Sequence, residues 1–151
     1  MARADISEVE FRDIFFEYML QDNMDLFYEV PVFSRSVDLV QYDDKRNIIT
    51  AIELKLSNWK KALEQLANIE ICFDYLTLCI IMPSTKEGQD RIKTNCEEKG
   101  VGLYFYNLTN ERFTCELQPS RVSKQWELQK QSIIRYLEGI EDHGCIKAST
   151  I

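Results

Sequence analysis

The stretch TAIELKLSNW, residues 50–59, places two charged side chains inside an otherwise apolar strand. Alternation over residues 48–56 puts the side chains of 48, 50, 52, 54 and 56 on one face of the strand. Glu53 and Lys55 therefore share the other face. A carboxylate and an ammonium within a core strand must be paired or functional, because burying an unpaired charge is costly. This segment singles out Glu53 and Lys55 as candidate site residues.

A hairpin brings a second carboxylate to this strand. Residues 36–42 form a strand, and the polar run 43–47 forms a turn. If Asp43 pairs with Ile48, Asp38 lies directly opposite Glu53, with Cβ atoms about 4.5–5.5 Å apart on one face. Two facing carboxylates repel each other. A divalent cation between them would neutralise this repulsion, so the pair is a candidate cation-binding site. A slip of one residue would turn Asp38 to the opposite face, so the inference depends on this register.

The rest of the chain alternates between strand and helix patterns. A Ser7-to-Glu10 capping box precedes the first helix, Asn58 or Ser57 can cap the second, and Gly100 closes the third. The predicted helices cover about 6–20, 59–71, 84–99 and 121–138, and the predicted strands cover 27–33, 36–42, 48–56, 75–82, 101–106 and a short edge strand at 113–117. We expect a core over 5–117, a C-terminal helix over 121–138 and a loose tail over 139–151.

Hairpin strands come first and crossover units second. This order, α-β-β-β-α-β-α-β with an extra C-terminal helix, predicts an α/β fold of the α+β type, with a mixed sheet in a three-layer α/β/α arrangement. At 151 residues the chain has the size of a single domain. The last helix either closes the core or builds a dimer contact, and both roles remain open.

Composition excludes several classes of protein. Apolar residues make up 45% and charged residues 28%, no apolar run approaches the ~20 residues of a membrane span, and residues 1–10 lack a signal-peptide core. Five cysteines without a C-x-x-C pair indicate reduced thiols, so we expect a cytoplasmic protein without a membrane partner. The single histidine, His143, excludes mechanisms that need two. A net charge of −7 means that any contact with DNA uses a local basic patch or metal ions held by carboxylates.

The order of elements and the spacing Asp38…Glu53-x-Lys55 resemble the PD-(D/E)xK nuclease superfamily, which has the restriction-endonuclease-like fold. The resemblance covers about residues 7–106. The stretch ELKLSNWKKALEQ, residues 53–65, is similar to that of small, uncharacterised prokaryotic members. Val37 stands where many members have Pro. Ile69 stands where the Gln-x-x-x-Tyr subgroup has Tyr, which counts against a RecB-like exonuclease.

The resemblance implies a divalent-metal-dependent nuclease that hydrolyses phosphodiester bonds of DNA. It implies that Asp38, Glu53 and the backbone oxygen of Leu54 hold Mg²⁺ or Mn²⁺. Lys55 would orient the attacking water and help to deprotonate it, and the metal would stabilise charge on the scissile phosphate and the leaving oxygen.

The resemblance also suggests supporting residues, each with an ordinary structural alternative. Glu8 in the first helix would be a further metal ligand and catalytic residue, or simply a favourable charge in a first helical turn. Gln65 would hold the substrate or the site water, or be an exposed helix residue. Lys60 and Lys61 are candidates for phosphate contacts, or belong to a solvated helix face. Arg35 would bind phosphate or pair with Asp38.

A second hypothesis is a catalytically inactive nuclease-fold module that binds nucleic acid or a protein partner. The small size and the acidic charge favour it. Within the enzyme hypothesis the substrate could also be branched DNA or RNA, and a homodimer is possible. Glu29 is either a polar strand residue or a further site carboxylate, and Trp59 either a packing anchor or a stacking platform for a base.

Overall fold

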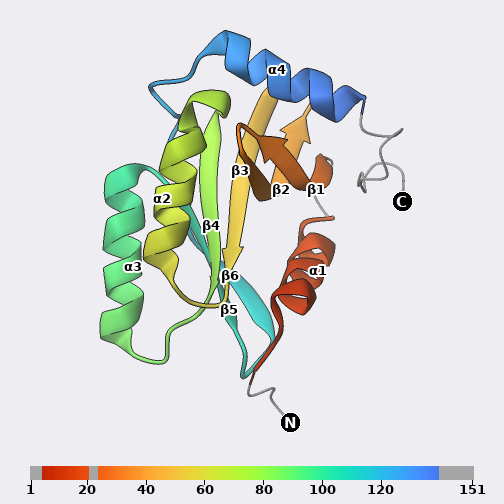
Figure 1. Ribbon diagram of the computed structural model, residues 1–151. Helices are drawn as coiled ribbons and strands as arrows, with labels where there is room; N and C mark the ends of the chain where they lie inside the picture. Colours follow the sequence, from red (N-terminus) through yellow and green to blue (C-terminus); the bar gives the residue numbers. More distant parts are fainter. Residues whose placement is uncertain (1–4, 21–23, 140–151) are drawn as a thin grey trace.

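The computed structural model describes residues 5–20 and 24–139 (Figure 1). The described chain forms one six-stranded sheet in the spatial order β1-β2-β3-β4-β5-β6, flanked by helices. The elements are α1 (Glu8–Met19), β1 (Asp25–Val32), β2 (Arg35–Asp43), β3 (Ile48–Lys55), α2 (Trp59–Ile69), the 3₁₀ helix η1 (Glu70–Cys72), β4 (Tyr75–Ile81), α3 (Lys86–Lys99), β5 (Gly102–Asn107), β6 (Arg112–Leu117) and α4 (Glu127–Glu138).

The sheet is mixed, as the order of elements predicts. β1, β2 and β3 pair antiparallel through hairpins, whereas β3, β4 and β5 are parallel and are connected by α2 and α3. β6 returns antiparallel to β5 and forms the predicted edge strand. Parallel strands need crossover helices, so the change from hairpins to crossovers occurs at β3, the strand that carries Glu53 and Lys55.

Helices cover both faces of the sheet, which confirms the three-layer arrangement (Figure 1). On one face lies the α1-side core, in which Phe11 and Phe15 pack against Ile52 and Leu54 of β3. On the other face lies the larger α2-side core, which holds the buried residues of α2, α3 and α4. β3 is therefore buried on both faces, so a polar side chain on it needs a partner.

Local signals at the helix ends are largely confirmed. Ser7 Oγ accepts a hydrogen bond from Glu10 N at 3.1 Å, and Glu10 Oε1 accepts one from Ser7 N, which completes the capping box. Gly100 ends α3 with φ of +69°, a conformation that glycine adopts without strain. The prediction of a side-chain cap on α2 is wrong for Asn58. This residue precedes the helix in the left-handed conformation, with φ of +53°, and its side chain makes no capping bond.

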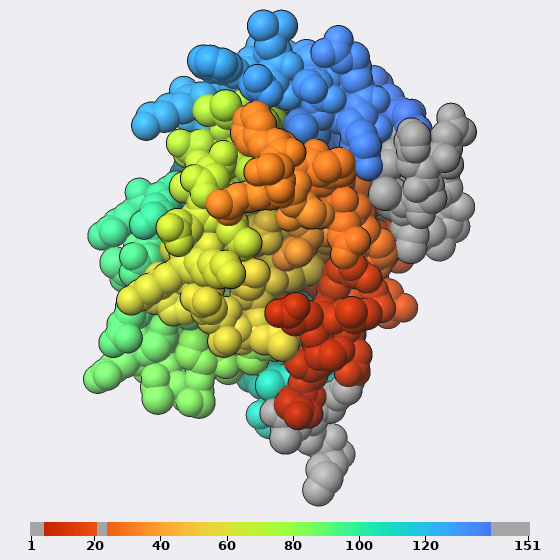
Figure 2. Space-filling model, in the orientation of Figure 1, coloured from red at the N-terminus to blue at the C-terminus, as the bar shows by residue number. Residues whose placement is uncertain are grey.

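The C-terminal helix begins later than predicted, at Glu127 rather than near 121. The segment before it is irregular and is hydrogen-bonded to the core: Val122 N donates to Asp74 O at 2.8 Å, and Trp126 N donates to Ile71 O at 2.8 Å. α4 then buries three apolar side chains in the α2-side core, namely Ile133, Ile134 and Leu137. Figure 2 shows α4 lying across the ends of the hairpin strands and of α2. Of the two roles left open for this helix, closure of the core is confirmed.

A buried carboxylate connects this C-terminal segment to the sheet. Asp74 is fully buried and accepts hydrogen bonds from Ile49 N at 2.9 Å, Gln125 Nε2 at 2.8 Å and Arg121 at 3.0 Å. The ammonium of Lys130, itself almost fully buried, lies 3.0 Å from Asp74 Oδ2. These four donors compensate the carboxylate for its lost hydration.

No helix within residues 5–20 and 24–139 is long and apolar enough to cross a membrane. In the same part of the chain Cys72, Cys79, Cys96 and Cys115 are free thiols. Cys145, His143 and the predicted loose tail from residue 140 onward lie outside the described residues.

Candidate metal centre

The hairpin between β2 and β3 has the predicted register. Asp43 pairs with Ile48, and the pairing continues to Leu39 opposite Ile52. Asp38 and Glu53 are the next residues of their strands. They therefore meet at the point where the regular ladder ends.

The first two strands break their alternation at the same place. Phe27 and Val30 of β1 both belong to the α2-side core, although residues three apart in a regular strand face opposite sides. Val37 and Val40 of β2 show the same break. The register pairs on either side of it place Glu29 opposite Asp38, with neither residue in the regular ladder. Glu29 has φ of +46°, which is rare for a residue with a side chain, so the backbone is distorted here.

At this break the Asp38 carboxylate accepts a hydrogen bond from a backbone amide. Leu54 N donates a hydrogen bond to Asp38 Oδ2 at 2.8 Å, which fixes the carboxylate against β3 directly beside Glu53. Asp38 thus has a structural role of its own, because it satisfies a buried amide at the end of the β2–β3 ladder.

Glu53 is the most perturbed carboxyl of the described chain. It is only 4% exposed, and alternation with Leu54 places it on the α2 side of the sheet. Burial, followed by the hydrogen bond and the charge of Asp38, raises the pKa of Glu53 from 4.5 to about 9. The ammonium of Lys55 acts in the opposite direction and lowers this pKa. At neutral pH Glu53 therefore keeps its proton, which it can donate in the hydrogen bond to Asp38.

Lys55 and Gln65 lie on the same side of the sheet as this pair. Lys55 is half-buried at the end of β3, on the same face as Glu53. α2 packs on this face through Ala62, Leu63 and Leu66. The Oε1 atom of Gln65 on the same helix is buried and has no hydrogen-bond partner among the described residues. An unpaired buried acceptor is costly, so this atom is available for a water, an ammonium group or a substrate donor.

The donor set suits a hard divalent cation. Within residues 5–20 and 24–139 no three His, Cys, Asp or Glu side chains cluster, so Asp38 and Glu53 are the two carboxyl groups that could hold a cation at this site. Mg²⁺ is commonly held by one or two carboxylates and keeps several waters. A cation that binds here would replace the proton of Glu53, because two ionised carboxylates in contact need a positive charge between them.

The other predicted residues are not joined to this pair. Glu8 is exposed in the first turn of α1, which packs on the opposite face of the sheet, and no hydrogen bond or ion pair connects it to the pair within the described chain. Arg35 is exposed at the start of β2 and forms no ion pair with Asp38 among the described residues. Lys60 and Lys61 are exposed on α2, and the Lys60 ammonium lies 5.6 Å from the centre of the Trp59 ring.

Glu29 carries a further carboxylate beside the hairpin break. It forms an ion pair with Arg12 of α1 at 3.0 Å, and its side chain is largely exposed. The guanidinium of Arg12 also lies 4.5 Å from the centre of the Tyr28 ring. Of the two readings left open for Glu29, the structure supports a residue that connects β1 to α1.

The sequence analysis does not predict two polar features of the structure. One is the buried Asp74, whose side-chain partners follow it in the chain by 47 residues or more. The other is a pocket on the α1 face of the sheet, lined in part by Gln41, Thr50 and Thr77. The available signal was the presence of these polar residues in otherwise apolar strands.

Comparisons with known proteins give information about the fold alone. No protein-family model matches the sequence, and no curated protein matches it. Among solved structures, a protein of unknown function from Silicibacter pomeroyi is similar, with a TM-score of 0.60 and 16% identity over 93% of this chain and 97% of the other. A repair endonuclease from Pyrococcus abyssi has a TM-score of 0.47 and 22% identity over 72% of this chain and 50% of its own.

Proposed function

We propose that this protein is a divalent-metal-dependent nuclease that hydrolyses phosphodiester bonds of DNA. The observation that carries the proposal is the buried contact between Asp38 and Glu53, with Lys55 next to it on the same strand face. A like-charged pair without a cation opposes folding above the normal pKa of a carboxyl group. A site that costs stability in this way is more readily explained by function than by stability.

Each residue has a distinct role in the proposed reaction. Asp38 and Glu53 hold Mg²⁺ or Mn²⁺, with the backbone oxygen of Leu54 as a further ligand. The bound cation supplies Lewis-acid stabilisation of charge on the phosphate. Lys55 orients the attacking water and assists the loss of its proton, and Gln65 Oε1 accepts a hydrogen bond from that water or from the Lys55 ammonium.

The surface next to the pair suits a phosphate group better than the net charge suggests. β3 ends at Lys55, and α2 begins at Trp59 with no side chain capping its first amides. Uncapped amides at a helix start favour anions. Lys60 and Lys61 lie in the same first turn, so we propose that they contact the backbone of the nucleic acid while the overall charge remains −7.

The test is a cleavage assay on a panel of linear, nicked, single-stranded and branched DNA and RNA, with Mg²⁺, Mn²⁺ or EDTA. Wild-type protein is compared with Glu53→Gln and with Glu64→Gln, a matched change at an exposed position of α2. We expect metal-dependent cleavage by the wild type and by Glu64→Gln, and none by Glu53→Gln. The substrate that is cut identifies the subclass.

Equal activity of all three proteins would refute the assignment of the site. Absence of cleavage by all three, together with DNA binding that needs no metal, would instead support the inactive nuclease-fold module. The acidic charge of the chain favours that alternative.

A further inference from the structure

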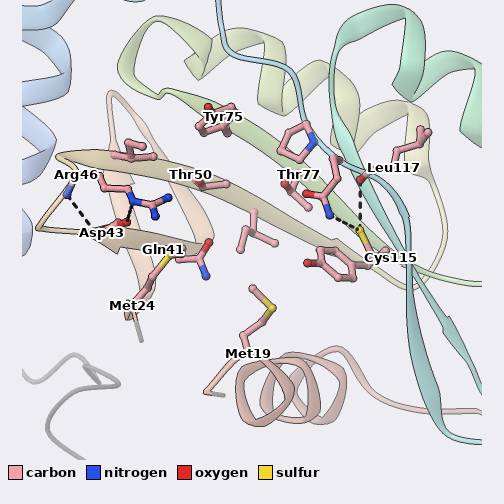
Figure 3. A pocket seen from close by; sticks show the side chains of 15 residues that line it. Met19, Met24, Gln41, Asp43, Arg46, Thr50, Tyr75, Thr77, Cys115 and Leu117 are labelled. Carbon is pink, nitrogen blue, oxygen red and sulfur yellow. Dashed lines mark hydrogen bonds and ion pairs between the residues drawn. The ribbon is translucent and has the colours of Figure 1, made fainter. Parts of the chain in front are cut away.

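A second pocket lies on the opposite face of the sheet from the carboxylate pair. It has a volume of about 540 Å³, which is within the usual range for small-molecule sites. Met19 in the last turn of α1 and Met24 before β1 form one side of it (Figure 3). α1 covers only part of this face, and the pocket occupies the part beyond its C-terminal end.

The floor of the pocket is a row of polar groups on three adjacent strands. Gln41 of β2 pairs with Thr50 of β3, and Thr50 pairs with Tyr75 of β4. Thr77, two residues further along β4, adds a hydroxyl and is 4% exposed. Neighbours in such a row are about 5 Å apart. Together, the row and Thr77 present an amide, two hydroxyls and a phenol to the pocket.

One of these groups lacks a partner. Gln41 Nε2 is buried and donates no hydrogen bond within residues 5–20 and 24–139. Figure 3 shows the Gln41 carboxamide directed into the pocket between Thr50 and Met19. A buried donor without an acceptor costs free energy, and a ligand acceptor placed here would recover it.

The walls are neutral and partly aromatic. Arg46 at the rim lies 3.7 Å from Asp43, so the one cation that lines the pocket is paired with its one carboxylate. Tyr75 and Tyr104 contribute rings, and the two methionines contribute flexible thioethers that adapt to flat ligands. These walls disfavour a charged ligand and favour a planar, uncharged one.

The far wall is fixed by close packing. Gly102 of β5, the partner of Thr77, has no room for a side chain, because a Cβ atom there would lie 2.8 Å from Pro119 Cδ and 3.0 Å from Thr77 Oγ1. Gln118 Nε2 donates to Cys115 Sγ at 3.4 Å on the same wall. This side of the pocket is therefore preformed, which lowers the entropic cost of binding.

We propose that this pocket binds a small uncharged molecule with a nucleobase, such as a nucleoside. A nucleobase combines a flat face for the tyrosine and methionine side chains with an edge that carries both donors and acceptors. Gln41 Nε2 donates to an acceptor on that edge, and the hydroxyls of Thr50 and Thr77 bind the remaining edge groups. The site is separate from the carboxylate pair and does not depend on the proposed nuclease activity.

The test is a titration of the full-length protein with adenosine, guanosine, cytidine and uridine, followed by calorimetry and amide NMR. We expect saturable binding of at least one nucleoside, with shifts at Gln41, Thr50 and Thr77. Gln41→Leu and the near-isosteric Thr77→Val each weaken binding tenfold or more. Gln131→Leu on α4 and Glu53→Gln on the other face leave the affinity unchanged.

The proposal is overturned if none of the four nucleosides binds up to millimolar concentration, or if Gln41→Leu and Thr77→Val both bind like the wild type. Circular dichroism shows which variants fold. If Gln41→Leu does not fold, the binding measured with Thr77→Val decides the test. A change of sedimentation in Gln41→Leu without any nucleoside binding by the wild type would identify the face as a contact between two copies, which also overturns the proposal.

Discussion

Replacement of Glu53 by Gln should stabilise the protein at neutral pH in the absence of divalent metal. Glutamine keeps the size of the side chain and still donates a hydrogen bond to Asp38, but it does not titrate. In the wild type the pKa of Glu53 is about 9 in the folded chain and 4.5 in an exposed environment. Between these two values the folded state holds a proton that the unfolded state has released, so the free energy of unfolding falls as the pH rises.

The size of the effect follows from this difference. Each pH unit above 4.5 lowers the free energy of unfolding of the wild type by about 1.4 kcal/mol, so at pH 7 it is lower by about 3 kcal/mol. Glu53→Gln avoids this loss. We expect its stability advantage to be near zero at pH 4.5, to grow up to about pH 9 and to stay level above it.

The assay is urea denaturation at pH 5, 6, 7 and 8 in EDTA, with the midpoint and slope fitted at each pH. Glu64→Gln is the matched control, because this carboxylate is exposed on α2, and its stability should follow the wild type. Parallel pH profiles for the wild type and Glu53→Gln, or a variant that is less stable than the wild type at pH 8, would refute the reasoning that folded Glu53 retains its proton.

Further predictions follow from the same contacts. Added Mg²⁺ should raise the melting temperature of the wild type but not of Asp38→Asn, since a ligand of the folded state stabilises it by mass action; equal shifts in calorimetry would contradict this. Lys130→Met should lower the free energy of unfolding by about 3–5 kcal/mol because Asp74 loses its buried counter-ion, and a loss below 1 kcal/mol in urea titrations would be inconsistent with it. Gln65→Leu should keep or increase stability while lowering kcat, because it removes an unpaired buried acceptor; unfolding and cleavage data on one preparation separate the two effects. Burial and the nearby Asp13 raise the pKa of Tyr28 from 10.0 to about 12, and a spectrophotometric titration that compares the wild type with Tyr28→Phe should show the loss of a phenol that titrates near this value; loss of a phenol that titrates near 10 would contradict the contact.

The parts of the fold that can be predicted from the sequence are those specified by residues close to one another in the chain. Alternation in β3, the capping box of α1 and Gly100 after α3 each depend on a few neighbouring residues, and the structure confirms all three. The prediction that the last helix starts near residue 121 is wrong, because the amides of Val122 and Trp126 bind the carbonyl oxygens of Asp74 and Ile71, far earlier in the chain, instead of starting a helix. Non-local hydrogen bonds of this kind leave no periodic pattern.

The candidate site was predictable to a similar degree. The register of the hairpin follows from its polar turn, and it brings Asp38 beside Glu53. The break of alternation at Glu29 and Asp38 was not predictable, because both strands contain ordinary apolar residues on either side of it. The resemblance suggests Gln65, whereas the lack of a partner for its oxygen follows only from the packing of α2 on the sheet.

The Asp74 network also sets an order for folding during synthesis. The ribosome releases the sheet before residues 121–130, which carry three of the four donors to this carboxylate. Until they emerge, only the Ile49 amide can bind Asp74 within the fold, so the start of β3 and β4 stays open to water. The C-terminal segment therefore completes the folding of the domain. A nascent chain stopped near residue 120 should be far more sensitive to protease than one stopped near 139.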